Sequence, residues 1–232
     1  MSHPKFPIEN KLLQALSPAG IERLGPMELV ELGLRQDLEH AGKPIAWVYF
    51  IESGLASVVA GNDELGKIEV GMIGPEGMTG ISLLLEDEQA TFDVFVQGPG
   101  EALRISAEKL REAMSADAEV RRVLVRYAHA FGIQVATTAL ANGQAKLESR
   151  LARWLLMVAD RLGATFHVTH EFLALMLAVR RSGVTLALHI LEGKALIRAT
   201  RGSISIIDRD GLIAHAAGSY GFAEAEYRRL LG

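Results

Sequence analysis

The first part of the chain has apolar residues at helical spacing. The stretch from Asn10 to Leu24 predicts a helix, with a break at Ser17-Pro18, because proline ends a helix or begins a new one. The apolar positions are Leu12, Leu13, Leu16, Ile21 and Leu24.

From about Leu29 to Ile105 the pattern changes to short apolar runs separated by Gly, Asp, Asn and Pro. The clearest runs cover residues 46–51, 55–59, 67–70 and 92–96. Several short strands at this spacing predict a sandwich or a barrel. The glycines between the runs are interpreted as turns. They are Gly54, Gly61, Gly66, Gly98 and Gly100.

A long helical region follows the strands. Ser106 is a typical N-cap, and from Ala116 to about Leu140 there is no proline and one glycine, Gly132. One stripe of apolar to small residues recurs in steps of four and three, as in helices that pack on a partner helix. It comprises Val120, Leu124, Tyr127, Phe131, Gln134 and Thr138. The stripe fits a dimer seam or an amphipathic helix lying on its own domain, and both alternatives stay open.

Residues 168–192 predict two short helices joined by a tight turn at 177–179. A preceding helix, Leu147 to Leu162, ends at Gly163. Thr169 caps the first short helix, and the second runs from Arg180 to Glu192. Its inward positions are Val184, Leu188 and Leu191. This pattern is typical of a helix-turn-helix, whose second helix enters the DNA major groove.

A β-hairpin is predicted next, from Leu196 to Ile207, with Arg201 at its tip. A hairpin directly after a helix-turn-helix indicates the wing of a winged helix, and a cation at its tip suits a phosphate. Asp208 then caps a short helix from Arg209 to Ala217, which ends at Gly218.

Charge divides the chain in the same way. Residues 1–142 carry 12 Lys+Arg and 20 Asp+Glu, whereas residues 143–232 carry 12 and 8, so an acidic part precedes a basic part. A basic module attracts polyanions, most commonly nucleic acid. The composition is otherwise ordinary for a globular protein of 232 residues, with 49% apolar and 22% charged residues. With no long apolar segment and no signal-peptide core, we expect a soluble cytoplasmic protein without membrane contact.

Taken together, these motifs resemble the Crp/Fnr family of bacterial transcription regulators over nearly the whole chain. The resemblance rests on residues 49–58, the glycine-rich stretch 71–80, the connecting helix, and the helix-turn-helix with its wing. It implies an α+β fold: an N-terminal β-roll (cyclic-nucleotide-binding-like jelly roll) at 1–115, a long dimerisation helix at 116–142, and a C-terminal winged helix-turn-helix at 143–232. Two such modules in a homodimer would bind an inverted-repeat site on double-stranded DNA.

The resemblance also assigns DNA-contacting residues. The main base-contacting arginine of the family falls on Arg181, which suits bidentate bonds to guanine. Arg180, Ser182 and Thr185 are expected on the same exposed face. Phosphate candidates are Thr169 and Arg201, and His189 is a further contact candidate.

The nucleotide pocket departs from the family. Members that bind cyclic nucleotides have a Gly-Glu pair, whose Glu holds the ribose, and an Arg-Ser/Thr pair, whose Arg neutralises the phosphate. The matching positions here are Gly80-Ile81 and Ala90-Thr91. An unpaired buried phosphate is costly, and the acidic run 86–88 is close in sequence, so cAMP and cGMP are not expected to bind in the usual manner.

Other functions find little support. There is no cysteine, and the pair His167 and His170 lacks further ligands at a suitable spacing, so we expect no metal, no other cofactor and no enzyme activity. The remaining partners are an unknown small-molecule effector and RNA polymerase. The chain is predicted to be a dimeric, sequence-specific DNA-binding regulator. The alternative is a signal-binding dimeric module whose helix-turn-helix serves protein interaction.

Overall fold

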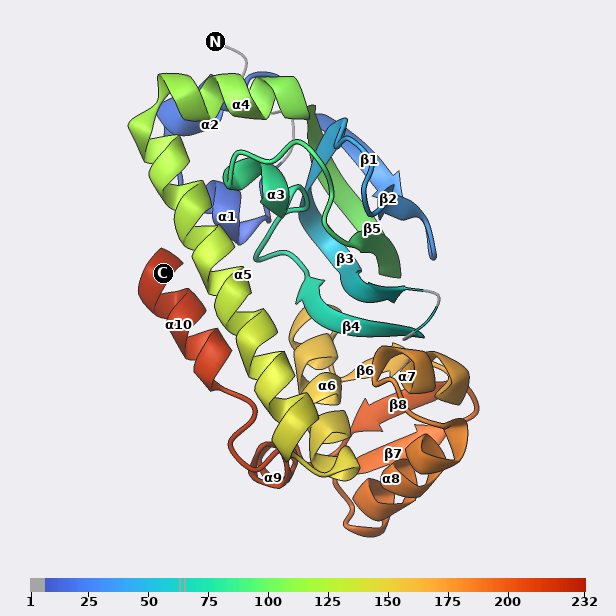
Figure 1. Cartoon of the computed structure of the whole chain (residues 1–232). Helices are drawn as coiled ribbons and strands as arrows, with labels where there is room; N and C mark the ends of the chain where they lie inside the picture. The colour runs from blue at the N-terminus through green and yellow to red at the C-terminus, as the bar shows by residue number, and fades with distance from the viewer. Residues whose placement is uncertain (1–6, 63, 65) are drawn as a thin grey trace. The chain divides into compact units, whose positions relative to one another are not determined.

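Figure 1 shows the computed structural model, which describes residues 7–62, 64 and 66–232. The chain forms two compact units. The first contains residues up to 58, residues 72–132 and residues 227–232, and the second contains residues 59–71 and 133–226. Each unit is built around its own apolar core.

The first unit begins with the predicted broken helix. It consists of α1 (Lys11–Gln14) and α2 (Pro18–Leu24), capped by Asn10 and Ser17. Asn10 is fully buried, and its amide also donates to the carbonyls of Ile51 at 2.7 Å and Gly77 at 2.8 Å. The cap residue therefore also ties the N-terminal helices to the β-roll.

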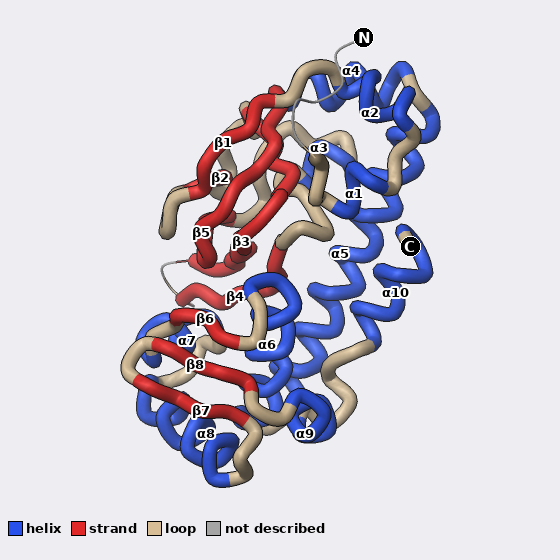
Figure 2. Tube along the Cα trace, turned by 180° about the vertical axis from the view of Figure 1, so that it is seen from behind, coloured by secondary structure: helices blue, strands red, loops and turns tan. Residues whose placement is uncertain are grey.

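A five-stranded sheet forms most of the body of this unit (Figure 2), although its residues 59–71 belong to the second unit. Its strands are β1 (Glu28–Leu32), β2 (Asp37–Glu39), β3 (Trp47–Asn62), β4 (Gly66–Ile73) and β5 (Asp93–Ser106). The order is β1-β5-β3-β4, with β2 also paired to β5. In the antiparallel β1–β5 pair, Glu28 lies opposite Arg104 and Leu32 opposite Gly100. A short helix, α3 (Ile81–Leu84), follows β4. The predicted N-terminal roll is confirmed.

The interpretation of Gly54, Gly61, Gly98 and Gly100 as turns is wrong. Gly54 and Gly61 lie within β3, and Gly98 and Gly100 lie within β5. A Cβ on Gly54 would lie 2.6 Å from the Gly98 carbonyl oxygen, and one on Gly100 would overlap the Ser53 carbonyl oxygen. These glycines permit the backbones of β3 and β5 to approach closely. The residues in contact are far apart in sequence, so the local sequence around each glycine does not reveal the contact.

Helices α4 (Ala107–Ala116) and α5 (Ala118–Gln144) follow the sheet, with Ser106 as the expected N-cap of α4. Val120 and Leu124 are fully buried, and Tyr127 is 3% exposed and donates to the Met78 carbonyl at 3.0 Å. These three residues belong to the core of their own unit. This part of the α5 stripe is thus an intramolecular packing face, which is one of the two alternatives left open by the sequence.

The second unit contains the predicted helix α6 (Leu147–Leu162), followed by the helix pair α7 (His170–Met176) and α8 (Arg181–Gly193). Its sheet has the order β6-β8-β7, from β6 (Thr165–His167), β7 (Ile197–Thr200) and β8 (Ser203–Ile206). The predicted hairpin is confirmed as β7–β8, and β6 is an additional strand. Helix α9 (Arg209–His215) is capped by Asp208 as predicted, and α10 (Phe222–Leu231) ends the chain.

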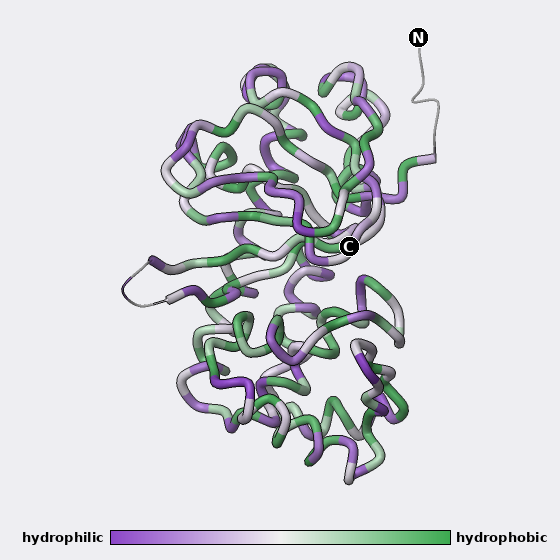
Figure 3. The backbone as a smooth tube through the Cα atoms, turned by 90° about the vertical axis from the view of Figure 1, so that its right-hand side faces the viewer, coloured by the Kyte–Doolittle hydropathy of each residue, from purple (hydrophilic) through white to green (hydrophobic). Residues whose placement is uncertain are grey.

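Apolar residues are distributed over the strands and helices of both units (Figure 3). Within the described residues, no single helix combines the length and apolar composition needed to cross a membrane. Helices α7 and α8 satisfy that test only as a pair bent by 105°.

The close approach of β3 and β5 predicts a large effect of Gly100→Ala. The added methyl group would collide with the Ser53 carbonyl, so we expect a loss of about 1–3 kcal/mol in the free energy of unfolding, measured by chemical denaturation. Gly33→Ala is the matched control, because its nearest neighbour, the Gln36 amide oxygen, is 3.7 Å away. Equal stability of the two variants would contradict the packing described for Gly100.

Candidate nucleic-acid interface

Helices α7 and α8 form a compact helix-turn-helix. Thr169 caps α7, and its hydroxyl accepts from the Phe172 N–H at 3.2 Å. In the turn, Ala178 has a left-handed φ of 50°, and the Val179 N–H donates to the Ala174 carbonyl at 2.9 Å. The 105° bend between the helices lies in the range of the DNA-binding motif.

Three apolar residues set the rotation of α8. Val184 and Leu191 are fully buried and Leu188 is 1% exposed, as predicted from the sequence. Close packing against α6 also involves Gly183, where a Cβ would lie 3.1 Å from a methyl group of Leu147. The opposite side of α8 is left at the surface.

The predicted contact residues lie around this surface. Arg180 is the N-cap of α8, and Arg181 and Ser182 begin its first turn, all three exposed. His189 is exposed two turns later, and Thr169 is exposed at the start of α7. The structure therefore brings the N-terminal ends of both helices to one part of the second unit.

Thr185 is less accessible than these residues. It is half-buried, and its hydroxyl donates to the Arg181 carbonyl at 3.2 Å and lies 3.1 Å from His170 Nδ1. The two histidines considered as metal ligands contact different groups. His170 Nδ1 lies beside the Thr185 hydroxyl, whereas His167 Nδ1 lies 3.2 Å from the Gly202 carbonyl oxygen.

An ion pair engages Arg181. Its Nε lies 2.6 Å from Glu171 Oε1 on α7, and both side chains are 65% exposed. The pKa of the Glu171 carboxyl is lowered, first by its own backbone N–H and then by Arg181. An exposed pair of this kind is weak, so Arg181 can exchange the carboxylate for another acceptor.

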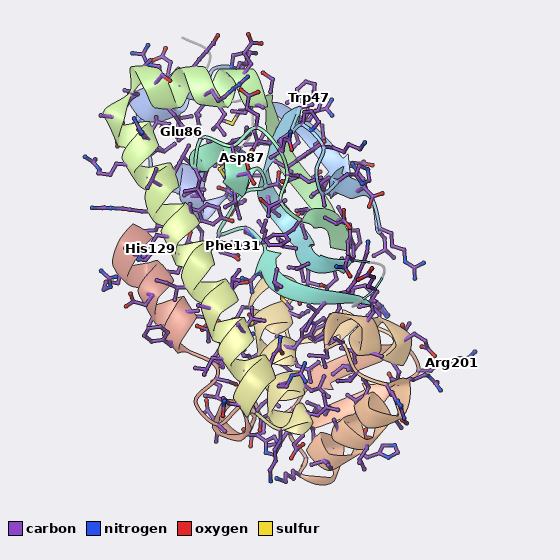
Figure 4. The ribbon with its side chains drawn as sticks, in the orientation of Figure 1. Trp47, Glu86, Asp87, His129, Phe131 and Arg201 are labelled. Atoms are coloured by element: carbon purple, nitrogen blue, oxygen red, sulfur yellow. The ribbon has the colours of Figure 1, made fainter. Side chains whose placement is uncertain are left out.

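The wing carries two further cations. Arg201 lies at the β7–β8 tip, next to Gly202 with a φ of 75°, and is exposed (Figure 4). Arg198, which was not among the predicted contacts, is exposed on β7. The alternation of side chains between the two faces of the predicted strand could have indicated that Arg198 is exposed. The Ala199 N–H donates to Glu192 Oε1 at 2.9 Å, which ties the wing to the end of α8.

A buried polar cluster also holds α6 in place. The Trp154 indole donates to Glu69 Oε1 on β4 at 2.8 Å, and Arg150 donates to the Leu177 carbonyl in the helix-turn-helix turn at 2.5 Å. Arg153 is 6% exposed, and burial lowers the pKa of its guanidinium. The sequence pattern did not predict this cluster, because Glu69 and Trp154 are 85 positions apart.

In the first unit, Gly80 stands at the start of α3 with a left-handed φ of 79°. A Cβ there would lie 2.6 Å from a methyl group of Val48, so a larger residue does not fit. The Gly80 N–H donates to Glu39 Oε1 at 2.5 Å. The Gly80 N–H is therefore already hydrogen-bonded to a carboxylate of the protein itself.

The other predicted pocket residues carry no positive charge. Ile81 is half-buried, and Ala90 is 2% exposed within the apolar core. Thr91 is exposed, and its hydroxyl lies 3.2 Å from that of Ser82 on α3. The structure thus brings the two predicted segments together, but with apolar and hydroxyl groups.

The acidic loop beside this pocket is partly neutralised. Glu86 pairs with Arg121 at 2.9 Å, and Glu88 pairs with Arg111. Glu86 and Asp87 follow α3 (Figure 4). The Asp87 carboxylate accepts from the Gln89 N–H at 3.0 Å, so this loop is held by local contacts.

Two family models match the chain. A cyclic nucleotide-binding domain matches residues 30–117, and a Crp-like helix-turn-helix domain matches residues 149–215. Among curated proteins, no sequence is significantly similar to this chain.

Solved structures share the fold. A transcriptional regulator of the crp/fnr family from Eubacterium rectale is 18% identical, with 89% of this chain and 98% of that chain covered and a TM-score of 0.71. FixK2 from Bradyrhizobium japonicum is 14% identical, with 82% and 96% covered and a TM-score of 0.70. The c-di-GMP responsive global regulator CLP of Xanthomonas campestris is 20% identical, with 82% and 99% covered and a TM-score of 0.67.

Burial of Glu39 predicts a specific dependence of stability on pH. Desolvation raises the pKa of this carboxyl, and the bonds from Gly80 and Thr79 only partly oppose it. An acid whose folded-state pKa is raised contributes stability below its unfolded pKa of about 4.3 and loses it as pH rises through the folded value. Glu39→Gln is therefore expected to be more stable than the parent at neutral pH.

The expected gain is about 1.4 kcal/mol for each pH unit by which burial raises the pKa, and it shrinks as the pH falls towards 4.3. Denaturant unfolding at several pH values measures it. Glu31→Gln, at an exposed position of β1, is the control and should leave the profile unchanged. A Glu39→Gln variant less stable than the parent at every pH would show that the ionised carboxylate stabilises the fold despite its burial.

Proposed function

Because the chain belongs to the Crp/Fnr family by its two matched domains, we propose that it is a dimeric, sequence-specific DNA-binding transcription regulator that does not respond to cAMP or cGMP. The family consists of regulators and not of enzymes, and its solved relatives have the same fold. We assign residues 1–115 to the sensor, 116–142 to the dimerisation helix and 143–232 to the DNA-binding domain.

The exposed N-terminal end of α8 is the observation that carries this proposal. Arg180, Arg181 and Ser182 are all accessible there, and the wing adds Arg198 and Arg201. Arginine at the start of a recognition helix suits guanine O6 and N7, whereas cations of the wing and Thr169 suit phosphates. His189 and the half-buried Thr185 are secondary candidates within the same helix.

Dimerisation through α5 is supported by the face opposite the core. Residues 127–144 contain no Asp, Glu, Lys or Arg, although part of this stretch is at the surface. Five of the exposed positions recur in steps of four and three, a spacing suited to a helix partner. They are Val125, His129, Gly132, Ala136 and Leu140. In a symmetric dimer, two copies of α8 would meet an inverted repeat.

The pocket chemistry supports independence from cyclic nucleotides. Ile81 offers no acceptor for a ribose hydroxyl, and Ala90 is buried where a phosphate would need a cation. Glu39 already occupies the Gly80 N–H and would repel an approaching anion. Another small-molecule effector and a contact with RNA polymerase remain part of the proposal without assigned residues.

Substitution of the two key arginines tests the proposal. Arg181→Ala should lose about 1–3 kcal/mol of specific binding and relax the base preference at one position per half-site. Arg201→Ala should weaken binding to all sequences alike and reduce the salt slope of log K by about 1. Both are measured by fluorescence anisotropy over a series of salt concentrations.

Arg23→Ala, at an exposed position in α2, serves as the control and should bind like the parent. If both variants retain the parent's affinity and salt slope, α8 and the wing do not contact DNA. A parent protein without any salt-dependent DNA affinity would instead favour the alternative of a protein-interaction module.

Gly132→Glu tests the dimer surface. Nothing lies within 4 Å of a Cβ at this position, so the variant should fold, yet its bulk and charge would separate two closely packed helices. We expect a monomer by analytical ultracentrifugation. Arg126 is an exposed α5 residue outside the exposed row that contains Gly132, so Arg126→Glu should remain dimeric. A dimer of unchanged affinity in Gly132→Glu would contradict the assigned face.

A further inference from the structure

One large apolar side chain stands on the exposed side of α8. Leu186 is 63% exposed, whereas its neighbours on this side, Ser182 and His189, are polar. Exposed apolar residues are common singly at protein surfaces. This one calls for a functional explanation because it lies between Ser182 and His189, on the side of α8 opposite its buried residues.

Leu186 lies outside the buried core of its own unit. The core side of α8 is occupied by Val184, Leu188 and Leu191, all nearly or fully buried. Because successive residues turn by about 100° around a helix, Leu186 points away from Val184 and from the core. Its methyl groups are therefore free to contact a partner of this surface.

We propose that Leu186 recognises the C5-methyl group of a thymine in the major groove. This inference rests on the proposed entry of α8 into that groove. Thymine is the only base that presents a methyl group there, and apolar side chains are its natural partners. A leucine can neither donate nor accept a hydrogen bond, so at this position it selects by apolar contact alone.

The geometry of α8 restricts where the thymine lies. Leu186 follows Arg181 by five residues, which corresponds to about 7.5 Å along the helix axis. Because a recognition helix lies in the major groove at an angle to the DNA axis, this distance spans at most about two base pairs, and the thymine is expected close to the base contacted by Arg181. The inference thus adds a second specified position to each half-site.

Replacement of thymine by deoxyuridine tests this directly, because it removes only the methyl group. The duplex is the sequence that the full-length protein selects from random DNA, and each thymine of one half-site is replaced in turn. Loss of one buried methyl group should weaken binding by the parent protein about four-fold at one position, from about 0.8 kcal/mol per methyl group. Leu186→Ala should bind the two duplexes equally.

Leu175→Ala is the matched control, because Leu175 is an apolar residue of α7 that is 47% exposed. This variant should keep the four-fold preference of the parent for thymine. Circular dichroism and thermal unfolding of both variants verify that removal of a surface leucine leaves the fold intact.

Four outcomes would overturn the inference. Sequence-specific binding that is insensitive to deoxyuridine at every position, or equally sensitive in Leu186→Ala, would show that Leu186 reads no methyl group and would leave the proposed function standing. Unchanged DNA binding with loss of transcription activation in Leu186→Ala would assign the side chain to a protein contact. Absence of any selected sequence would overturn the proposed function together with this inference.

Discussion

Burial of Val184, Leu188 and Leu191 fixes the rotation of α8, and the interface depends on that rotation. A helix that buries one side commits the other side to solvent or to a partner. Arg181, Ser182, Leu186 and His189 are consequently exposed together. The tight turn at Ala178 and the bond from Arg150 to the Leu177 carbonyl hold the two helices at their angle. The apolar core of the second unit therefore determines which side chains of α8 are exposed and, under the proposed function, offered to DNA.

In the first unit, the cost of burying a charge limits which ligands the pocket can bind. A cyclic nucleotide brings a phosphate that requires a compensating cation in a buried pocket. Ala90, which we propose to stand at the position of that cation, lies in the apolar core. At the start of α3 the Gly80 N–H donates to the Glu39 carboxylate, which is an acceptor like the phosphate itself. Under the proposed function, the same roll is retained without the chemistry that binds a cyclic nucleotide.

Local signals in the sequence were sufficient for much of this fold. Helix α6 ends at Leu162 as predicted, because Gly163 provides a local cap, and the wing follows from strand alternation around Gly202. Contacts between distant residues could not be predicted in this way. The approach of Gly54 to Gly98, the bond from Gly80 to Glu39 and the pair of Arg181 with Glu171 all depend on tertiary packing. The stripe of α5 was visible, but only the fold shows that Val120 and Leu124 face their own core.

Selection of binding sites from random double-stranded DNA tests the central claim most directly. The purified full-length protein is used without nucleotide and again with cAMP, and the recovered DNA is sequenced. An inverted repeat recovered equally in both conditions is the predicted result, because α8 of each protomer would read one half-site and the pocket lacks the chemistry for cAMP. An inverted repeat recovered only with cAMP would contradict the account of Ile81 and Ala90, and no enrichment in either condition would contradict the claim that the protein reads DNA without a further signal.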